Sequence, residues 1–511
     1  MALQASMKVR PEKRLRAVTN GVKPVFEVMT RSGRRIRATA NHPLRTIRGW
    51  ERLDALKQGE RIAVARRLQC GPGSGEDLRK WRTLGYLIAE GNLCHPHGVY
   101  YYSTQQDEVD DFIDNVRVFG NAEVTVNRSK SAMSVYVGQT RRGYGNALFM
   151  WLSELELIGK KATEKALPSC VYALDENELG ELLAGMWQGD GCIHEKGHGQ
   201  VFYATSSKVL AEQVQHLLLR LGVFSTLHKK RFKYDGGTKT GFTIHVSHRE
   251  NLMRFEKTIG KRLLSRKKES LQVILGRLEK AYAGTEGIIA RGTKDVVPAE
   301  VLSGIRMEMA TTGASVSSFA ARTGLAPRLF HSDVRRLGYS RAVLDRIADQ
   351  LASTELKDLA TSDVYWDEIV SIKAAGDEMT YDLEVPGSHN FVANDFVVHN
   401  SHAASYGIVA YQTAYMKANF PAEYMTALMT AESGDLERVS EAVKECESMG
   451  IKVLPPDVNS SEAGFTYIDD QTIRFGLIDA VRVVVEASRI IAPAIASSSR
   501  KTWPTVCPTR R

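Results

Sequence analysis

The segment Val397-Val398-His399-Asn400-Ser401 carries the side chains needed for a protein to cut its own backbone. The side-chain amide of Asn400 can attack its own carbonyl, form a succinimide and release the residue that follows. A preceding histidine, here His399, can donate a hydrogen bond to that carbonyl or protonate the leaving amine. Ser401 supplies a hydroxyl that can first accept the upstream chain as an ester. The triplet alone is more typical of a turn, so self-cleavage depends on further residues.

A second reactive pair lies near the N-terminus in Thr39-Ala40-Asn41-His42, directly after an alternating stretch. A threonine and a histidine three residues apart can both point at one backbone carbonyl and polarise it. An ordinary strand exit with Asn41 and Pro43 in the turn explains the same residues. These four residues leave both interpretations open.

Two carboxylates, Glu90 and Asp190, each end an apolar helical stretch and precede a glycine, 100 positions apart (190 − 90). The stretches 78–93 and 179–193 have helical spacing, and glycine is a common helix C-cap. A carboxylate at the negative end of a helix dipole is unfavourable. Because both helices end in a carboxylate despite this cost, a cation is expected to compensate the charge, and Mg²⁺ is the simple candidate. The alternative is two core helices with coincidental ends.

The elements around these acids form an internal repeat with a period near 100 residues. After each acid come strand-like segments and a further amphipathic helix, which predicts an α-β-β-α unit used twice. The strand-like segments are 99–103, 135–137, 200–204 and 241–246, and the helices are 109–118 and 210–221. A Gly/Pro/Ser linker at 71–75 separates this repeat from residues 22–68, which alternate as β-strands.

Basic residues concentrate around the second repeat, interleaved with Phe232 and Tyr234, as suits a duplex-binding surface. A solvated charged face is the alternative. The candidate DNA-binding residues are Lys229, Lys230, Arg231, Lys261 and Arg262. Residues 315–347, through the stretch 316–328, add a loose helix-turn-helix pattern with Gly324 at the turn.

Composition limits the class of protein. With 43% hydrophobic and 25% charged residues, the 511-residue chain is typical of globular protein, and its net charge of +9 favours a polyanionic partner such as nucleic acid. The sequence has no apolar run of membrane-spanning length and no signal peptide. The 6 cysteines form no Cys-x-x-Cys pair, which excludes a zinc ribbon and favours a reducing, cytoplasmic location.

Together, Thr39 to His42, His399 to Ser401 and the segment Tyr381-Asp-Leu-Glu-Val-Pro-Gly-Ser-His389-Asn-Phe-Val-Ala393 resemble an intein, a self-splicing element with a mostly-β Hint fold. The resemblance implies that Thr39 and His42 activate an upstream scissile bond. It implies that Asp382 and His389 assist transesterification and cyclisation, which His399 and Asn400 complete.

The paired helices resemble the LAGLIDADG (DOD-type) homing endonucleases that nest inside inteins, over residues 76–280. The match is carried by Leu183-Ala-Gly-Met-Trp-Gln-Gly-Asp190-Gly191, and by Gly85 with Ala89-Glu90-Gly91. It implies that Glu90 and Asp190 hold Mg²⁺ and activate water against each strand of double-stranded DNA. Glu90 replaces the usual aspartate. Lys165 matches the position of a basic residue that polarises the water or stabilises charge in some members.

From Ser401 onward the sequence resembles the alpha subunit of bacterial DNA polymerase III. The match runs through Ser401-His-Ala-Ala-Ser-Tyr-Gly and continues in Val453-Leu-Pro-Pro-Asp-Val-Asn-Ser and Ile473-Arg-Phe-Gly-Leu477. This segment would be the C-extein. It carries neither the palm carboxylates nor the phosphoesterase domain of that family, so polymerase activity is not expected.

The predicted fold is multidomain α+β: a mostly-β Hint domain interrupted by a two-repeat αββαββα-type endonuclease and followed by an α-helical extein. We expect a monomer whose DNA target is the intein-less polymerase gene. Competing hypotheses are a decayed DNA-binding remnant, a non-functional fragment and a simple polymerase subunit. The predicted boundaries are 1–70 and 361–400 for Hint, 76–280 for the endonuclease, 281–360 for a helical DNA-recognition region, 401–477 for the extein and 478–511 for a divergent tail.

Two departures from the intein pattern affect the expected chemistry. The 38 residues before Thr39 contain no Cys and no opening splice motif, so we expect an N-terminally truncated reading frame and incomplete splicing. Cyclisation of Asn400 could still release the extein. The tail 478–511 no longer resembles the polymerase and is rich in Ser, Arg and Pro. A frameshift is the hypothesis that would explain this change.

Overall fold

The computed structural model describes residues 1–13, 16–96, 98–129, 132–139, 146–197, 199–234, 237–282, 295–333, 336–385, 387–400, 403–433 and 435–477. Ser401 and the predicted tail 478–511 lie outside these residues. The chain divides into two compact units, Met1–Ser401 and His402–Arg511. The expected mixed α+β class is confirmed, since both units contain helices and strands. In the described part of the chain, no helix has the length and apolar character to cross a membrane.

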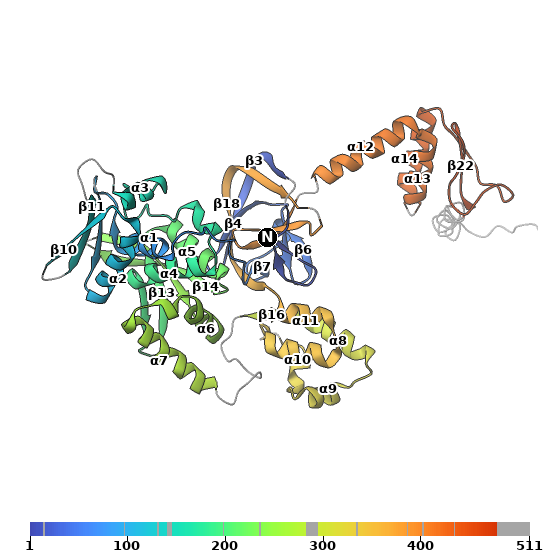
Figure 1. The fold of residues 1–511 in the computed structure, drawn as a ribbon. Coiled ribbons are helices and arrows are strands. Elements are labelled where there is room, and N and C mark those ends of the chain that lie inside the picture. The colour runs from blue at the N-terminus through green and yellow to red at the C-terminus, as the bar shows by residue number, and fades with distance from the viewer. Residues whose placement is uncertain are drawn as a thin grey trace, which may run out of the picture. The chain divides into compact units, whose positions relative to one another are not determined.

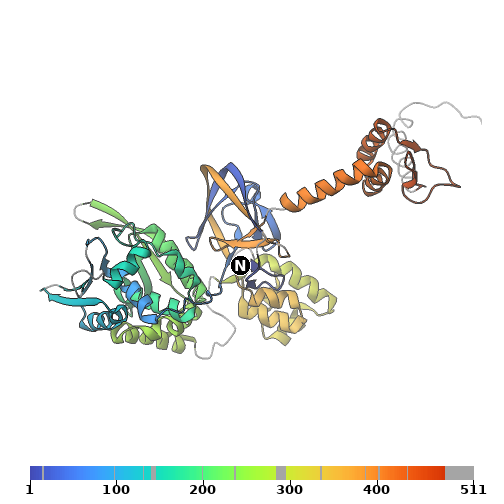
Figure 2. The same ribbon diagram turned by 45° about the horizontal axis from the view of Figure 1, so that its top comes forward.

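Both ends of the first unit contribute to one sheet, which has eight strands among the described residues. Its order is β4-β3-β18-β7-β20-β5-β6, with β19 paired to β20. The long strands β3 and β18, blue and orange in Figures 1 and 2, run antiparallel side by side although they are far apart in sequence. The bounds are Arg16–Thr30 (β3), Arg35–Thr39 (β4), Pro43–Thr46 (β5), Gly49–Arg52 (β6), Arg61–Ala65 (β7), Val364–Glu384 (β18), Asn390–Ala393 (β19) and Phe396–His399 (β20).

The core of this sheet follows from its alternating side chains. Val28, Ile36, Val64, Trp366 and Phe396 are buried in one cluster that draws residues from both segments. Burial of such side chains contributes roughly 1.5–3 kcal/mol each. The sheet therefore holds residues near 40 and near 400 in one body. A short pair, β1 (Ala2–Leu3) and β2 (Val9–Arg10), lies at the start of the chain, and β1 contacts β19.

The residues between β7 and β18 contain two copies of one supersecondary unit, helix–strand–strand–helix–strand–strand. The first copy is α1 (Leu78–Glu90), β8 (Gly91–Asn92), β9 (Val99–Ser103), α2 (Gln106–Val116), β10 (Ala122–Arg128) and β11 (Met133–Gln139). The second is α4 (Glu176–Gly189), β12 (Gly191–His194), β13 (Gln200–Thr205), α5 (Lys208–Arg220), β14 (Ser225–Tyr234) and β15 (Gly237–Val246). Both four-stranded sheets have the same strand order, β8-β9-β11-β10 and β12-β13-β15-β14. Each copy therefore holds the two predicted strands and two more, one after its first helix and one after its second.

Further helices flank the two copies. α3 (Ala147–Glu154) lies between them, and α6 (Arg249–Thr258), the 3-10 helix η4 (Gly260–Arg262) and α7 (Ser265–Tyr282) follow the second. A helical bundle with a small strand pair then precedes β18. It comprises β16 (Val296–Pro298), η5 (Ala299–Val301), α8 (Leu302–Thr311), α9 (Val316–Thr323), η6 (Pro327–Phe330), β17 (Gly338–Ser340), α10 (Arg341–Leu351) and α11 (Thr354–Thr361).

The helix-turn-helix pattern is reproduced only in part. α9 ends as predicted at Gly324, which adopts a left-handed conformation with φ of 65°. The next element is the four-residue 3-10 helix Pro327–Phe330, not a second α-helix. Pro327 fixes the first turn, and Phe330 is buried against Phe319. Within the described residues, the turn is therefore not followed directly by a recognition helix.

The second unit is helical with a small sheet. It contains α12 (Ala403–Asn419), α13 (Pro421–Ala431), α14 (Leu436–Ser448), β21 (Lys452–Leu454), β22 (Thr466–Asp469) and β23 (Thr472–Arg474). The three-stranded sheet β21-β23-β22 was not expected from the helical prediction. It forms because Ile473 is fully buried against Met425, Met429 and Cys446 of the helices.

Candidate active sites

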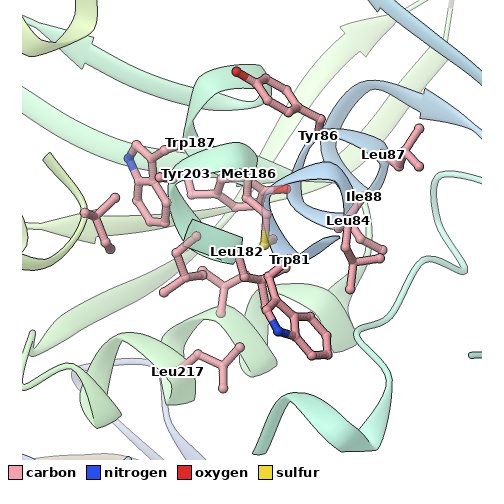
Figure 3. Packing of buried hydrophobic residues seen from close by; sticks show 14 of the residues in the cluster. Trp81, Leu84, Tyr86, Leu87, Ile88, Leu182, Met186, Trp187, Tyr203 and Leu217 are labelled. Carbon is pink, nitrogen blue, oxygen red and sulfur yellow. The ribbon is translucent and has the colours of Figure 1, made fainter. Parts of the chain in front are cut away.

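The helices α1 and α4 pack with their backbones in contact. A Cβ atom on Gly85 would lie 2.2 Å from the carbonyl oxygen of Leu182, and one on Gly185 would lie 2.5 Å from that of Arg82. Only glycine permits this approach. Large apolar side chains surround the contact, as Figure 3 shows for Trp81 and Leu84 of α1 with Leu182, Met186 and Trp187 of α4.

This packing brings the two predicted carboxylates together. Glu90 is the last residue of α1, and Asp190 is the C-cap of α4. A Cβ atom on Gly189 would lie 2.6 Å from Cβ of Ala89 and 3.0 Å from Cγ of Glu90, so the helix ends abut. Burial and the negative charge of Glu90 raise the pKa of Asp190 to about 7. Burial also raises the pKa of Glu90, against the opposing effect of Lys165. The effect of Glu90 on Asp190 indicates that the two acids lie close together, although Glu90 is exposed and Asp190 is half-buried.

Two buried lysines supply the positive charge at the helix ends. Lys165 Nζ donates to the carbonyl oxygens of Leu87, Ile88, Ala89 and Gly91 at 3.2, 2.8, 3.2 and 2.9 Å. Lys267 Nζ donates in the same way to Trp187, Gln188, Gly189 and Gly191 at 2.7, 2.5, 3.4 and 2.9 Å. Burial lowers the pKa of both ammonium groups, that of Lys267 to about 8. Each lysine thus neutralises the negative end of one helix dipole.

Lys267 is a site residue that the sequence analysis did not single out. It stands 77 positions after Asp190 (267 − 190), and Lys165 stands 75 after Glu90 (165 − 90). This near-equal spacing in the two copies was the available signal. The compensating cation inferred for each helix end is, in this structure, a lysine ammonium.

Two more buried groups that the sequence reasoning missed shape the acid pair. The hydroxyl of Tyr203 donates to Oδ2 of Asp190 at 3.4 Å from the strand position opposite Gly191. Glu108 accepts hydrogen bonds from Ser103 Oγ at 2.5 Å and from Gln188 Nε2 at 2.9 Å. Its charge contributes to the raised pKa of Glu90, and the second copy has Leu210 on its corresponding helix. The two halves of the site are therefore not equivalent.

The donor set fits a metal ion that keeps water and substrate oxygens among its ligands. Among the described residues, no group of three or more His, Cys, Asp or Glu side chains is arranged to hold a metal. Glu90 and Asp190 instead offer two carboxylates of hard oxygen donors. Mg²⁺ is commonly held by one or two carboxylates together with substrate phosphates.

The predicted self-cleaving junction forms a second site at the end of β20. His399 Nδ1 donates to the carbonyl oxygen of Asn400 at 2.7 Å. The backbone N–H of Asn400 donates to the carbonyl of His389 at 3.0 Å, and its Nδ2 donates to the carbonyl of Val385 at 3.0 Å. Asn400 is only 5% exposed. The Trp50 and His399 rings pack perpendicular to each other, with 4.8 Å between their centroids. Asn400 is thus fixed on both its backbone and its side chain.

The other predicted junction residues that the structure describes lie on the same sheet or directly beside its strands. Thr39 ends β4, and its carbonyl accepts from the N–H of His42 at 3.0 Å. Burial and the nearby His399 lower the pKa of His42 to about 4, so its imidazole is neutral at physiological pH. Asp382 is buried on β18, with Oδ1 accepting from the N–H of Leu383 at 2.8 Å. His389 has a left-handed backbone with φ of 53°, just before β19.

The predicted DNA-binding residues occupy different surroundings. On β14, Lys230 lies over the Phe202 ring with Nζ 5.6 Å from its centroid, and the neighbouring Lys229 and Arg231 alternate to the opposite face. Lys261 and Arg262 belong to η4. The Arg262 side chain is 10% exposed and pairs with Glu181 at 2.9 Å, so it joins η4 to α4.

One match to a known protein family ends at the predicted junction residue, Asn400. A family model described as the intein splicing domain matches residues 3–400. A replicative DNA helicase DnaB of Rhodothermus marinus is 34% identical over 401 residues, which are 76% of this chain and 41% of that protein. The DnaB of a Nostoc species is 32% identical over 446 residues, or 84% of this chain and 49% of that protein. The chain thus spans less than half the length of these relatives.

Other similarities cover smaller parts. A DNA polymerase III subunit alpha of Mycobacterium tuberculosis is 49% identical over 90 residues, 18% of this chain and 7% of that protein. A solved structure of an Ssp DnaB mini-intein variant covers 78% of both chains at 15% identity, with a TM-score of 0.21. The crystal structure of I-DmoI in complex with DNA and Mn covers 36% of this chain and 96% of that chain at 14% identity, with a TM-score of 0.27. These TM-scores are too low to carry an argument about function.

Proposed function

Because the chain belongs to the intein family, whose splicing-domain model it matches over residues 3–400, we propose that it is a self-cleaving intein carrying a DNA endonuclease, followed by polymerase sequence. The Hint-type splicing domain would comprise residues 1–70 and 361–400. The endonuclease would comprise residues 76–280, and 281–360 would be an accessory DNA-recognition region. Residues 401–477 would be a C-extein from DNA polymerase III alpha, as the 49% identity over 90 residues supports.

The proposed cleavage at the junction uses groups that are already in contact. Nδ2 of Asn400 attacks the Asn400 carbonyl carbon, the bond to the nitrogen of residue 401 breaks, and that nitrogen takes a proton. Residue 400 becomes a succinimide. The N–H of His399, 2.7 Å from the carbonyl oxygen, stabilises the negative charge that develops there. Asp382 and His389 would assist this step. Thr39 and His42 would polarise the upstream scissile carbonyl, and Ser401 would accept the ester.

Mass spectrometry of the purified full chain tests this proposal. Incubation should release residues 401–511 and leave a fragment that carries the succinimide or its hydrolysed form. Asn400→Ala should remain intact, since alanine has no attacking amide, and His399→Ala should cleave at least tenfold more slowly. An intact mass for the native chain after long incubation would refute self-cleavage.

The endonuclease proposal rests on one observation, the two carboxylates, exposed Glu90 and half-buried Asp190, that lie at the abutting ends of α1 and α4. Glu90 and Asp190 would hold a divalent ion, Mg²⁺ by the chemistry of the donors, which would supply an activated water and neutralise phosphate charge when bound. The chain's own groups orient the site, since Lys165 and Lys267 fix both helix ends and Tyr203 donates to Asp190. The reaction would be hydrolysis of one phosphodiester in each strand of double-stranded DNA.

Charge supports DNA as the partner. The net charge of +9 and the exposed lysines of β14 favour a polyanion. Lys229, Lys230, Arg231 and Lys261 would contact phosphates, so affinity should fall steeply with salt. Arg262 would act through its ion pair with Glu181. The proposed target is the polymerase gene without the intein.

Cleavage of a plasmid that carries the uninterrupted polymerase gene tests the endonuclease in the presence of Mg²⁺. Glu90→Gln and Asp190→Asn should abolish cutting and retain DNA binding in a gel-shift assay. Asp114→Asn, which changes an exposed carboxylate on α2, is the matched control and should cut normally. Binding by the native chain without any cutting would instead favour a decayed, DNA-binding remnant. Primer extension tests polymerase activity, and none is expected.

A further inference from the structure

A buried ion pair holds the turn that leads to the self-cleaving junction. Asn394 and Asp395 join β19 to β20, and both have left-handed backbones, with φ of 47° and 70°. The Asp395 carbonyl accepts from the N–H of Ala65 at 2.7 Å. Its carboxylate points inward to Arg34, with Oδ2 3.0 Å from Nε and side-chain exposures of 6% and 2%. Such a tight turn depends on its anchors to keep its conformation.

One anchor comes from the inserted repeat and not from the splicing sheet. Oδ1 of Asp395 lies 2.6 Å from Nδ1 of His216, on α5. Arg34 also reaches the second repeat, where Nη1 donates to the carbonyl of Ser225 at 3.2 Å and the guanidinium lies 4.3 Å from the centroid of the Phe224 ring. The turn is thus fixed jointly by two segments with different proposed activities.

The hydrogen bonds define the state of the His216 ring. Nε of Arg220 donates to Nε2 of His216 at 2.9 Å, so Nε2 carries a lone pair and the ring is neutral. The proton therefore lies on Nδ1 and is donated to Asp395. Arg220 is itself held by the carbonyl of Tyr172 at 2.7 Å. A directed chain of hydrogen bonds runs from the endonuclease repeat into the turn.

The turn is connected to the reacting asparagine by a short, paired strand. β20 runs from Phe396 to His399, and its ladder with β19 places Ala393 opposite Phe396 and Asn390 opposite His399. Asn400 then hydrogen-bonds to the carbonyl of His389. A movement of the turn therefore displaces the hairpin that holds both the His399 donor and the Asn400 amide.

We propose that His216, in the endonuclease repeat, is a positioning residue for cleavage at Asn400. The inference rests on the proposed splicing function. By holding Asp395, His216 keeps the β19–β20 hairpin in the one geometry in which Asn400 and His399 are aligned. Loss of the hydrogen bond would leave Asp395 with Arg34 alone and let the hairpin open more often. Reactions that depend on near-attack geometry are sensitive to such loosening.

Three variants of the full chain separate this role from general destabilisation. His216→Leu removes the donor to Asp395. His216→Asn keeps an N–H near the position of Nδ1. Gln213→Leu is the matched control on the same helix, because Gln213 hydrogen-bonds to the backbone of Leu167 within the endonuclease segment. Two readouts are the rate of release of residues 401–511 and the amide hydrogen exchange of residues 396–400.

We expect His216→Leu to speed amide exchange of residues 396–400 roughly tenfold and to slow release of residues 401–511 roughly tenfold. The loss of a hydrogen bond to a charged group accounts for changes of this size. His216→Asn should restore most of both, and Gln213→Leu should change neither. The proposal is overturned if His216→Leu leaves exchange unchanged, or if His216→Asn or Gln213→Leu loosens residues 396–400 as much. If the native chain releases nothing, the splicing function fails, and the exchange comparison still decides whether His216 positions the hairpin.

Discussion

Replacing Gly85 by alanine should separate the two helices that carry the acid pair. The added Cβ would meet the Leu182 carbonyl oxygen at 2.2 Å, the Met186 nitrogen at 2.8 Å and the Gly185 Cα at 2.9 Å. All three are backbone atoms, so no side chain can rotate away. Restoring an ordinary contact requires α1 and α4 to move apart by on the order of 1 Å.

The expected cost has two parts. Overpacking of this kind typically costs about 1–3 kcal/mol, and a clash with rigid backbone favours the upper end. A displacement of about 1 Å at a catalytic site can also reduce a rate roughly a hundredfold. Because Glu90 and Asp190 lie one at each helix end, Gly85→Ala should therefore lower both stability and DNA cleavage.

Gly276 offers a matched control. It lies within α7, and a Cβ added there would meet nothing within 4 Å. Gly276→Ala should stabilise the chain by about 0.5–1 kcal/mol, since alanine is the better helix former. Urea denaturation and plasmid cleavage of both variants provide the measurements. If Gly85→Ala unfolds at the native midpoint and cuts at the native rate, the close packing of α1 and α4 is not what aligns the acids.

Three other changes test separate contacts. The pKa of His42 is lowered to about 4 in the folded chain, so the unfolded chain binds a proton more readily. The free energy of unfolding should therefore fall as pH drops from about 6.5 towards 4. His42→Gln should flatten that part of a pH series of denaturation curves. Lys267→Met removes the donor to four carbonyls and should cost about 2 kcal/mol and slow DNA cleavage, whereas the exposed Lys268→Met should do neither. Asn390→Ala breaks two buried hydrogen bonds to the backbone of Leu3, of 2.7 and 2.9 Å, and should cost about 2 kcal/mol in thermal unfolding.

Local sequence patterns predicted the helices and turns better than they predicted which elements pack against each other. Helical spacing and a terminal glycine were enough to place Glu90 and Asp190 at two helix ends, and a repeat implies that its copies pack alike. Lys267 was missed because its role depends on where α7 lies after a long intervening segment. The residues around Gly324 predicted a turn correctly, but not the 3-10 helix that follows, because burial of Phe330 against Phe319 is a tertiary contact.

The hydrogen bond between His216 and Asp395 could not be predicted from the sequence. The two residues are separated by 179 positions, and each has an ordinary local context. Nothing in a helix that contains His216 indicates that its outer face meets a hairpin from the other end of the unit. Contacts of this kind follow from how the insert packs on the splicing sheet, which residue spacing does not encode.

The geometry of the sheet explains why so large an insert is tolerated. Ala65 at the end of β7 and Val364 at the start of β18 are direct ladder partners, so the chain leaves and re-enters the sheet at one point. The entropy of closing a loop grows only with the logarithm of its length, and an insert that folds by itself adds little more. The insertion therefore demands no contact with the sheet beyond its two ends. The insertion itself does not require the buried ion pair between Arg34 and Asp395 or the hydrogen bond between Asp395 and His216. A coupling between the two proposed activities therefore explains these contacts better than insertion alone.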